Sequence, residues 1–321
     1  MTFDSVKSNR FRFVLGLLIG VALLFAVTRF INLASTLERF DDYPWSKLWI
    51  ALVLSLGYYL LKALRWHYFL RVIDIRLPLR RSVLVYLAGQ WFAFTPAGEF
   101  VRAYLMTGYG FSFSRGSAAV AVQVLFDFLS LALVGSFSVL RYRDMATMVL
   151  PFTAILMAGI LAFAYSPLIG WERRFSFAAG AGRLLGAPWR SFYQYSLLLL
   201  GWRSLLIGLA LGLPAVVVAA AVLEEISRGY QISVSLSQSA YIYSLSHLAG
   251  GLSMLPHGLG AIEGSAVALF HYAGIDTADA ATAIVLFRLS TVGLGIVLGA
   301  GSLLLLRTPF AGPVPPRDSP E

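Results

Sequence analysis

Long apolar segments recur along the chain, and most of them are long enough to cross a membrane. A transmembrane helix needs about 20 mostly apolar residues. Six uninterrupted segments fit this length: residues 13–33, 48–70, 116–140, 146–168, 200–223 and 280–306. The pattern therefore predicts an all-α, polytopic integral membrane protein with about six full spanning helices.

Two further apolar segments, residues 82–106 and 237–273, are interrupted by proline and glycine. The first is too short for two crossings, so it predicts a re-entrant hairpin. The second is compatible with either a hairpin or two complete helices. In both cases we expect the segment to begin and end on the same side of the membrane.

The composition supports lipid as the solvent of this chain. Hydrophobic residues make up 58% of the sequence and charged residues only 13%, with a mean hydropathy of +0.76. Soluble domains are about 45–50% apolar and about 25% charged. The absence of cysteine excludes disulfides, thiolate metal sites and cysteine nucleophiles. We attribute the net charge of +9 to basic loops at the membrane surface, and expect no nucleic-acid partner.

Basic residues gather in alternate loops between the predicted spans. Cytoplasmic loops of membrane proteins are enriched in Lys and Arg, so this pattern predicts that both termini are cytoplasmic. The groups on that side are Lys7, Arg10 and Arg12, then Arg71, Arg76, Arg80 and Arg81, then Arg173, Arg174, Arg183 and Arg190, and finally Arg307 and Arg317. We expect a multi-pass protein of a bacterial-type cytoplasmic (inner) membrane.

The domain organisation is simple. We expect one transmembrane domain over residues 1–308 and a disordered, proline-rich cytoplasmic tail over 309–321. Residues 169–192 contain Arg, Gly and Trp, which predicts a segment along the membrane interface. The oligomeric state does not follow from the sequence.

An internal repeat relates about residues 48–140 to about residues 200–306. The segment from Val124 to Ser130 matches the segment from Val285 to Thr291, and the Pro-x-Gly breaks at Pro96 and Pro256 also correspond. Pro96 precedes Asp127 by 31 residues, and Pro256 precedes Arg288 by 32. Because the two broken segments enter from opposite sides in the predicted topology, the repeat is an inverted one, as in many transporters.

Asp127 and Arg288 lie inside predicted spans. A charge at the centre of a spanning helix costs roughly 2.5–3.5 kcal/mol on insertion scales. Such groups persist when they are paired, hydrated or functional. We expect Asp127 and Arg288 to pair across the repeat axis, where a purely structural ion pair is the alternative to a functional one.

The breaks themselves predict a polar site. Proline removes a backbone donor, and glycine allows sharp turns. Backbone freed at membrane depth must line a polar cavity or be buried in protein, and amides at the following helix start can bind an anion such as a phosphate. The breaking residues are Pro96, Gly98, Pro256, Gly258 and Gly260.

Ionisable residues follow both breaks. Glu99 and Arg102 follow the first, and Glu263 follows the second. We expect Arg65, Arg102 and Arg288 to hold a phosphate, and Glu99, Asp127 and Glu263 to gate or balance charge. The two glutamates could instead pair with Arg102 and Arg65, accept a proton, contact a cationic headgroup, or cap helix N-termini.

Three other features have simpler interpretations. Lys62, Arg65 and His67 near the end of a span fit side chains that extend to the headgroups. The Gly295-x3-Gly299 pattern fits close helix packing. The four histidines lack metal-ligand spacing and no nucleotide or nucleophile motif is present, so we expect no metal, no cofactor and no enzymatic activity.

The sequence resembles the flippase-like transmembrane domain of the lysylphosphatidylglycerol synthase family over roughly residues 10–306. The matching residues are Lys62-Ala63-Leu64-Arg65-Trp66, Gly89, Thr95-Pro96-Ala97-Gly98-Glu99, Arg102, Asp127, Pro256-His257-Gly258-Leu259-Gly260-Ala261-Ile262-Glu263 and Arg288. His257 stands where the family pattern has glycine.

The resemblance implies lipid transport. In two-domain members this region moves aminoacylated phospholipid between leaflets, while a soluble domain performs the synthase reaction. We expect no such soluble domain here, so synthase activity does not carry over. The expected substrate is an anionic or aminoacylated phospholipid or a polyprenyl-linked lipid. The alternatives are a non-transporting partner of a lipid-modifying synthase or glycosyltransferase, and an intramembrane lipid-modifying enzyme.

Overall fold

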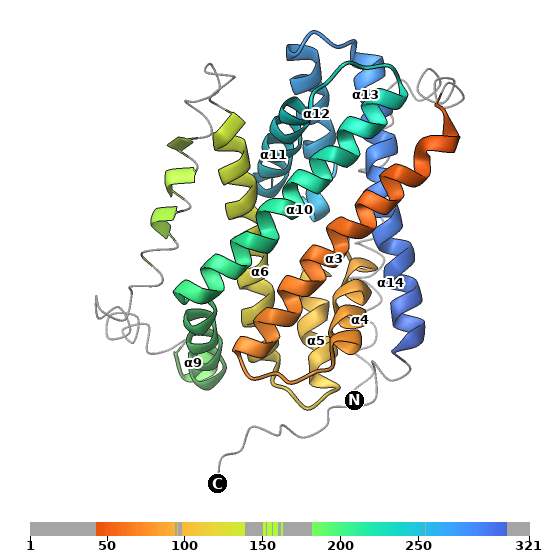
Figure 1. Ribbon diagram of the computed structural model, residues 1–321. Coiled ribbons are helices and arrows are strands. Elements are labelled where there is room, and N and C mark those ends of the chain that lie inside the picture. The colour runs from red at the N-terminus through yellow and green to blue at the C-terminus, as the bar shows by residue number, and fades with distance from the viewer. Residues whose placement is uncertain are drawn as a thin grey trace, which may run out of the picture.

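Figure 1 presents the computed structural model of the protein, a bundle of helices. The structure describes residues 43–138, 150–162 and 182–306, apart from positions 94, 96, 97, 152, 156, 160, 161 and 254. The elements of this part of the chain are all helical, and it contains no strand. The prediction of an all-α membrane protein is confirmed.

The first half of the bundle contains two spanning helices separated by a pair of short helices. Its elements are the 3-10 turn η1 (Trp45–Lys47), α3 (Leu48–Val72), α4 (Leu79–Gln90), the 3-10 turn η2 (Gly98–Phe100), α5 (Val101–Thr107) and α6 (Phe113–Ser138).

The second half has the same order of long and short helices, except that its last span includes a π-helical turn. Its elements are α10 (Trp202–Gly229), α11 (Leu236–Leu252), the 3-10 turn η4 (Pro256–Gly258), α12 (Ala261–Tyr272), α13 (Thr277–Arg288), the π-helical turn η5 (Leu289–Gly293) and α14 (Leu294–Leu305).

Four helices of the described chain are long and apolar enough to cross a membrane. They correspond to four predicted spans and are Trp45–Val72, Phe113–Phe137, Trp202–Gly229 and Thr277–Leu305. The predicted span 13–33 lies outside the described residues, and the span 146–168 lies largely outside them, as does the tail 309–321.

Both broken segments form hairpins of two short helices. The limbs of the first have 12 and 7 residues, and those of the second have 17 and 12. All are shorter than the roughly 20 residues of a crossing. In Figure 1 the α4–α5 hairpin enters from the lower end of the bundle and the α11–α12 hairpin from the upper end. The second segment is therefore a hairpin rather than two complete helices.

The two halves run in opposite directions. In Figure 1, α3 descends and α10, which packs along it, ascends. Three residue pairs also stand at equal distances from the starts of α4 and α11. They are Ser82 and Ser239, Tyr86 and Tyr243, and Gln90 and His247. Since these positions recur every four residues, they lie on one face of each helix. The arrangement has the form of an inverted repeat.

Local signals fix several helix ends. Ser235 and Gln238 form a capping box at the start of α11, and the side chain of Asp276 accepts from two backbone amides at the start of α13. These caps satisfy donors that the first helical turn leaves unpaired. They therefore set where the second hairpin begins and where the last span begins.

Small residues bring the last span close to the first half. A Cβ at Gly295 would overlap the hydroxyl of Tyr59, and a Cβ at Gly299 would overlap the backbone at Leu87 of α4 and at Trp91, which follows this helix. The expected packing role of this Gly-x3-Gly pattern is confirmed.

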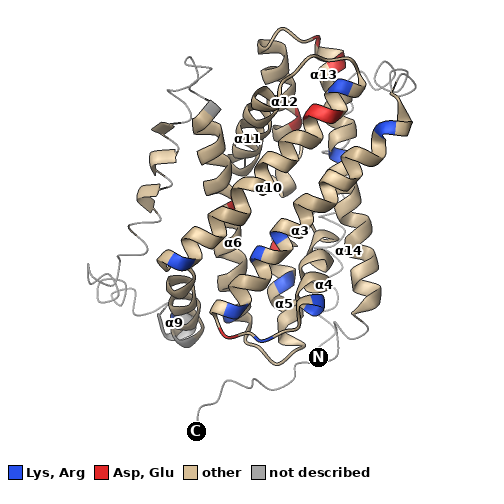
Figure 2. Cartoon of the chain, in the orientation of Figure 1, with Lys and Arg blue, Asp and Glu red and all other residues tan. Residues whose placement is uncertain are grey.

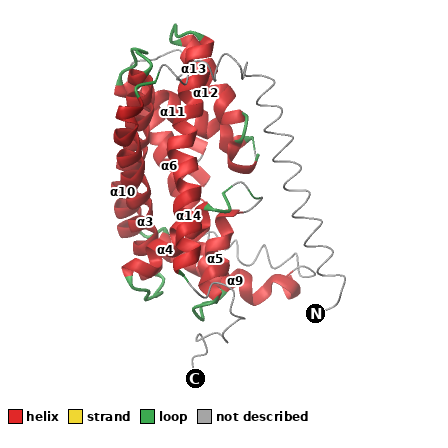
Figure 3. Ribbon diagram, turned by 90° about the vertical axis from the view of Figure 1, so that its right-hand side faces the viewer, coloured by secondary structure: helices red, strands yellow, loops and turns green. Residues whose placement is uncertain are grey.

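The remaining helix, α9 (Gly182–Leu199), lies differently. Figure 3 shows it across the lower end of the bundle, where it packs against α6. Its Trp189 side chain is exposed and stacks on Phe192. This placement fits an interfacial helix for residues 182–192, while residues 169–181 of the predicted segment lie outside the described residues.

Candidate functional site

A cavity of about 660 Å³ lies between the two hairpin breaks and the adjoining spans. The first break contributes Ala93, Thr95, Gly98 and Glu99, and the second contributes residues 255–259. Both broken segments therefore border one cavity, as expected if freed backbone lines a polar space.

One wall of the cavity is apolar. It is formed by α6 residues Val124, Phe128 and Leu131 and by α10 residues Gly212, Ala215, Val216 and Ala219. The spacing of three and four residues puts each set on a single helix face. A hydrocarbon chain can lie along this wall while a polar group occupies the space at the breaks.

Charged groups meet at mid-length of the bundle beside this wall. Most of each helix is uncharged, and Figure 2 shows basic and acidic segments together partway along α3. Lys62 Nζ on α3 lies 2.9 Å from Asp127 Oδ2 on α6, and it donates to the hydroxyl of Tyr58 at 3.0 Å. Arg65 also pairs with Asp127, through Oδ1. One carboxylate thus has two cationic partners.

The two cations differ in their access to the cavity. Lys62 lines it, and its side chain is 17% exposed, whereas that of Arg65 is 1% exposed. Gly212 makes room for Arg65, because a Cβ there would overlap its Nη1 atom and the hydroxyl of Ser130. The expectation that Lys62 and Arg65 extend to the headgroups is wrong, because Asp127 draws both into the protein interior.

Glu99 and Arg102 form an ion pair at the first break. Glu99 lines the cavity and its side chain is 43% exposed, while Arg102 is buried behind it. The guanidinium of Arg102 lies over the rings of Trp66 and Tyr86, at 5.4 and 5.0 Å from their centroids. A Cβ at Gly89 would overlap the Arg102 side chain, so α4 needs glycine there. Among the predicted alternatives for Glu99, the ion pair with Arg102 is the one observed in the structure.

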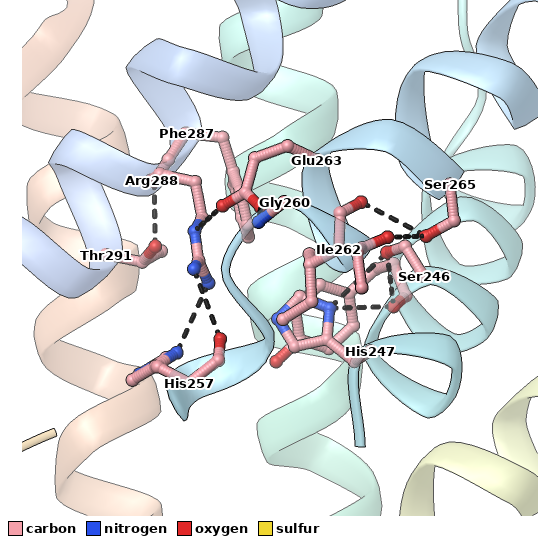
Figure 4. Close-up of polar contacts among 12 residues, drawn as sticks. Ser246, His247, His257, Gly260, Ile262, Glu263, Ser265, Phe287, Arg288 and Thr291 are labelled. Atoms are coloured by element: carbon pink, nitrogen blue, oxygen red, sulfur yellow. Dashed lines mark hydrogen bonds and ion pairs between the residues drawn. The ribbon is translucent and has the colours of Figure 1, made fainter. Parts of the chain in front are cut away.

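Glu263 joins two elements of the second half (Figure 4). Its Oε2 atom accepts from the backbone N–H of Gly260 at 2.7 Å, and its Oε1 atom lies 2.7 Å from Arg288 Nε. Glu263 is therefore an N-terminal cap of α12 that also forms an ion pair with α13. It pairs with Arg288 and not with Arg65, and the anion at this helix start is the chain's own carboxylate.

The backbone at the second break is left-handed at His257, Gly258 and Gly260, with φ values of 51°, 63° and 80°. Glycine adopts this region without strain, whereas other residues adopt it rarely. Arg288 holds His257 there, because its guanidinium donates to the His257 carbonyl at 3.3 Å and lies 3.4 Å from Nδ1. Glycine at position 257 would adopt this backbone without strain.

The predicted pairing of Asp127 with Arg288 is wrong. Asp127 pairs with Lys62 and Arg65 of its own half, and Arg288 pairs with Glu263 of the other half. Each intramembrane charge thus has an opposite charge from the same repeat unit. The expectation that such charges are paired holds, although the partners differ.

The predicted site residues separate into two layers. Five of them line the cavity: Gly98, Glu99, Asp127, Pro256 and Gly258. Those that do not line it are Arg65, Arg102, Gly260, Glu263 and Arg288. Pro96 lies outside the described residues. The arginines expected to hold a phosphate therefore form ion pairs outside the cavity lining.

Sequence reasoning missed several polar side chains of the lining, including three tyrosines, one histidine and one lysine: Tyr58, Tyr59, Tyr243, His247 and Lys62. A signal for Lys62 was present. It stands three residues before Arg65, so both cations lie on one helix face, and a buried face with two cations requires an acid on a neighbouring span.

The π-helical turn η5 also borders the cavity, through Thr291. The hydroxyl of Tyr59 on α3 donates to the Thr291 carbonyl at 3.0 Å. A π-helical turn widens a helix and frees backbone groups, and such turns often occur at functional sites. Here the Thr291 carbonyl accepts from the Leu294 amide within the turn and also from Tyr59 on α3.

The sequence of this bundle matches a model of a known protein family. The family model described as the lysylphosphatidylglycerol synthase TM region matches residues 13–299. No curated protein matches the chain. The match covers the described bundle up to the last turns of α14 and links the chain to membrane proteins of lipid synthesis or flipping.

Proposed function

Because the chain belongs to the family of the lysylphosphatidylglycerol synthase TM region, we propose that it moves a phospholipid or another lipid-linked amphiphile between the two leaflets of a membrane. The proposal includes no covalent step. It assigns to the protein the transport role of this membrane region and not the synthase reaction.

The cavity is the observation that carries this proposal. It combines an apolar wall from α6 and α10 with ionisable groups from α3, α6 and the first break. An amphiphile has the same division, with apolar tails and a polar headgroup. A headgroup at Lys62 and Glu99 exchanges its hydration for protein contacts, which lowers the cost of crossing the hydrocarbon core.

The inverted hairpins suggest how the cavity opens in turn to each leaflet. They enter from opposite ends of the bundle, and their breaks meet at the cavity. In transporters with inverted repeats, alternating access arises when one unit moves against the other around a fixed site. We assign the same kind of movement to the two halves here.

We further assign the lower end of Figure 1 to the cytoplasm of a bacterial-type inner membrane. Basic residues dominate that end and acidic residues are frequent at the other, which supports the assignment. The basic set is Arg71, Arg76, Arg80, Arg81, Arg190 and Arg203, and the acidic set is Glu224, Glu225, Asp276 and Asp279.

Leaflet-specific labelling in reconstituted vesicles tests the function. Vesicles with fluorescent phospholipid in both leaflets are treated with an impermeant quencher, and the quenchable fraction is followed over time. We expect the protein to raise the quenchable fraction from about half of the label to nearly all of it. Ala93→Trp, which fills the cavity at the first break, should slow this change at least tenfold.

The matched control is Leu206→Trp, which adds the same side chain at an exposed position of α10 and should move lipid at the wild-type rate. Equal rates for protein-containing and protein-free vesicles would contradict transport and favour a non-transporting partner of a lipid-modifying enzyme. Equal rates for Ala93→Trp and the wild type would contradict transport through this cavity.

A further inference from the structure

The ion-paired charges at and directly behind the cavity of the described bundle do not cancel. The cations of this set are Lys62, Arg65, Arg102 and Arg288, and its anions are Glu99, Asp127 and Glu263. The described ion pairs match Arg102 with Glu99 and Arg288 with Glu263. Asp127 then has two cations, so one positive charge remains uncompensated among these described residues.

An uncompensated charge is costly at membrane depth, because the low dielectric of the interior weakens its solvation. The surplus lies with Arg65 and Lys62, which share Asp127. Arg65 is held by its packing against Gly212 and Ser130, and it has no access to the cavity. The charge of Arg65 is therefore sufficient to compensate that of Asp127 without Lys62.

Lys62 is the cation that can change partner. It lines the cavity and is the more exposed of the two. Its ammonium group has three donors, and the described contacts engage Asp127 and Tyr58. A four-carbon side chain with rotatable donors can turn from Asp127 to a ligand in the cavity, while Asp127 keeps Arg65.

We propose that Lys62 binds the phosphate ester of the transported headgroup and that the site favours a lipid with one net negative charge. The inference rests on the proposed function and names the substrate class of the same cavity. A monoanionic headgroup cancels the surplus charge, so the loaded site is electrically neutral. A zwitterionic headgroup leaves the surplus in place.

Binding measurements on the full chain in detergent test this assignment without requiring transport. The probes are short-chain phosphatidylglycerol, which is monoanionic, and short-chain phosphatidylethanolamine, which is zwitterionic. We expect the wild type to bind the first at least about tenfold more tightly, as one desolvated charge pair allows. Raising the salt concentration should reduce this preference.

Two substitutions isolate the charge of Lys62. Lys62→Met keeps an apolar stem of similar length, leaves Asp127 paired with Arg65, and should abolish the tenfold preference. Lys62→Arg keeps the charge and should retain most of it. A thermal unfolding curve for each variant verifies the fold. Equal phosphatidylglycerol affinity for Lys62→Met and the wild type, or no preference in the wild type, would overturn the proposal.

A further arm distinguishes a lipid from a free phosphate ester. Glycerophosphoglycerol carries the same monoanionic headgroup without acyl chains, and we expect it to compete at least about tenfold less well, because it does not use the apolar wall. Equal competition would overturn the lipid as the ligand. A protein that binds phosphatidylglycerol through Lys62 yet moves no lipid would contradict only the proposed transport function.

Discussion

Glu263 and Arg288 form an ion pair of 2.7 Å that links the second hairpin to the last span, and both side chains are about nine-tenths buried. Since Glu263 also caps α12 through Gly260, one carboxylate fixes the start of a half-helix and the position of a neighbouring helix. The break in the second hairpin is therefore held from both sides, by this cap and by the contacts of Arg288 with His257.

Removal of the Glu263 charge should be strongly destabilising. Glu263→Gln keeps an oxygen for Gly260 but leaves Arg288 buried without its anion, which costs about 3–5 kcal/mol. Arg288→Gln should cost a similar amount, and the double variant should cost clearly less than the sum. Unfolding free energies of all four proteins measure this coupling, and additive losses would show that the pair contributes nothing.

Exchange of the charges of Asp127 and Arg288 should give no rescue. Asp127→Arg places a third cation beside Lys62 and Arg65, and Arg288→Asp places a second anion beside Glu263. The double variant should be no more stable than the worse single variant, as judged by thermal unfolding in lipid nanodiscs. A double variant with near wild-type stability would mean that the two residues interact directly.

Substitution of two glycines by alanine should be destabilising, because each glycine leaves room for a buried arginine. Gly212→Ala meets Arg65 and Ser130, and Gly89→Ala meets Arg102. Each should lower the free energy of unfolding by about 1–3 kcal/mol. Gly264→Ala is the control, because no atom lies within 4 Å of its added Cβ, and helical propensity alone should make it neutral or stabilising by up to about 1 kcal/mol. Equal effects at all three positions would contradict the packing explanation.

Tyr59→Phe tests the contact with the π-helical turn. It removes the hydroxyl that donates to the Thr291 carbonyl and should cost about 0.5–1.5 kcal/mol, the net contribution of one hydrogen bond, because the carbonyl keeps the Leu294 amide as a donor. Tyr68→Phe on the same helix is the control and should have little effect on unfolding. If both variants unfold like the wild type, the hydrogen bond does not stabilise the turn.

His257 should tolerate glycine and reject valine. Glycine relieves the left-handed backbone at φ 51°, which offsets part of the lost contact with Arg288. A β-branched residue in this region is strained, so His257→Val should be about 1–3 kcal/mol less stable than His257→Gly. Thermal unfolding of the two variants measures the difference, and a more stable valine variant would contradict the described backbone.

Apolar length and helix breakers predicted the architecture because both act locally. Four described spans and both hairpins lie where the sequence places them, since a crossing needs length alone and a break needs only proline or glycine. Helix capping by Glu263, one of the predicted alternatives, is also a local feature, because this residue stands three residues after Gly260.

Partner choice between distant charges was not predictable. The opposite charges of Asp127 and Arg288 and their equivalent positions in the two repeats favoured an ion pair between them. The pairs that form depend instead on how whole helices pack. The α3–α6 contact puts Lys62 and Arg65 beside Asp127, and Gly212 on a third helix makes that position possible for Arg65. No pattern within a single segment contains this information.

Because of the surplus cation at Lys62, the ion-paired groups of the two halves differ in net charge. A protein built from two copies of the first half would carry two such cations in its interior, and one built from two copies of the second half would carry none. Only a chain that combines one first half with one second half has a single surplus cation. In the proposed mechanism, the first half contributes the cation that binds the ligand, and the second half contributes the Glu263–Arg288 pair, which has no surplus charge.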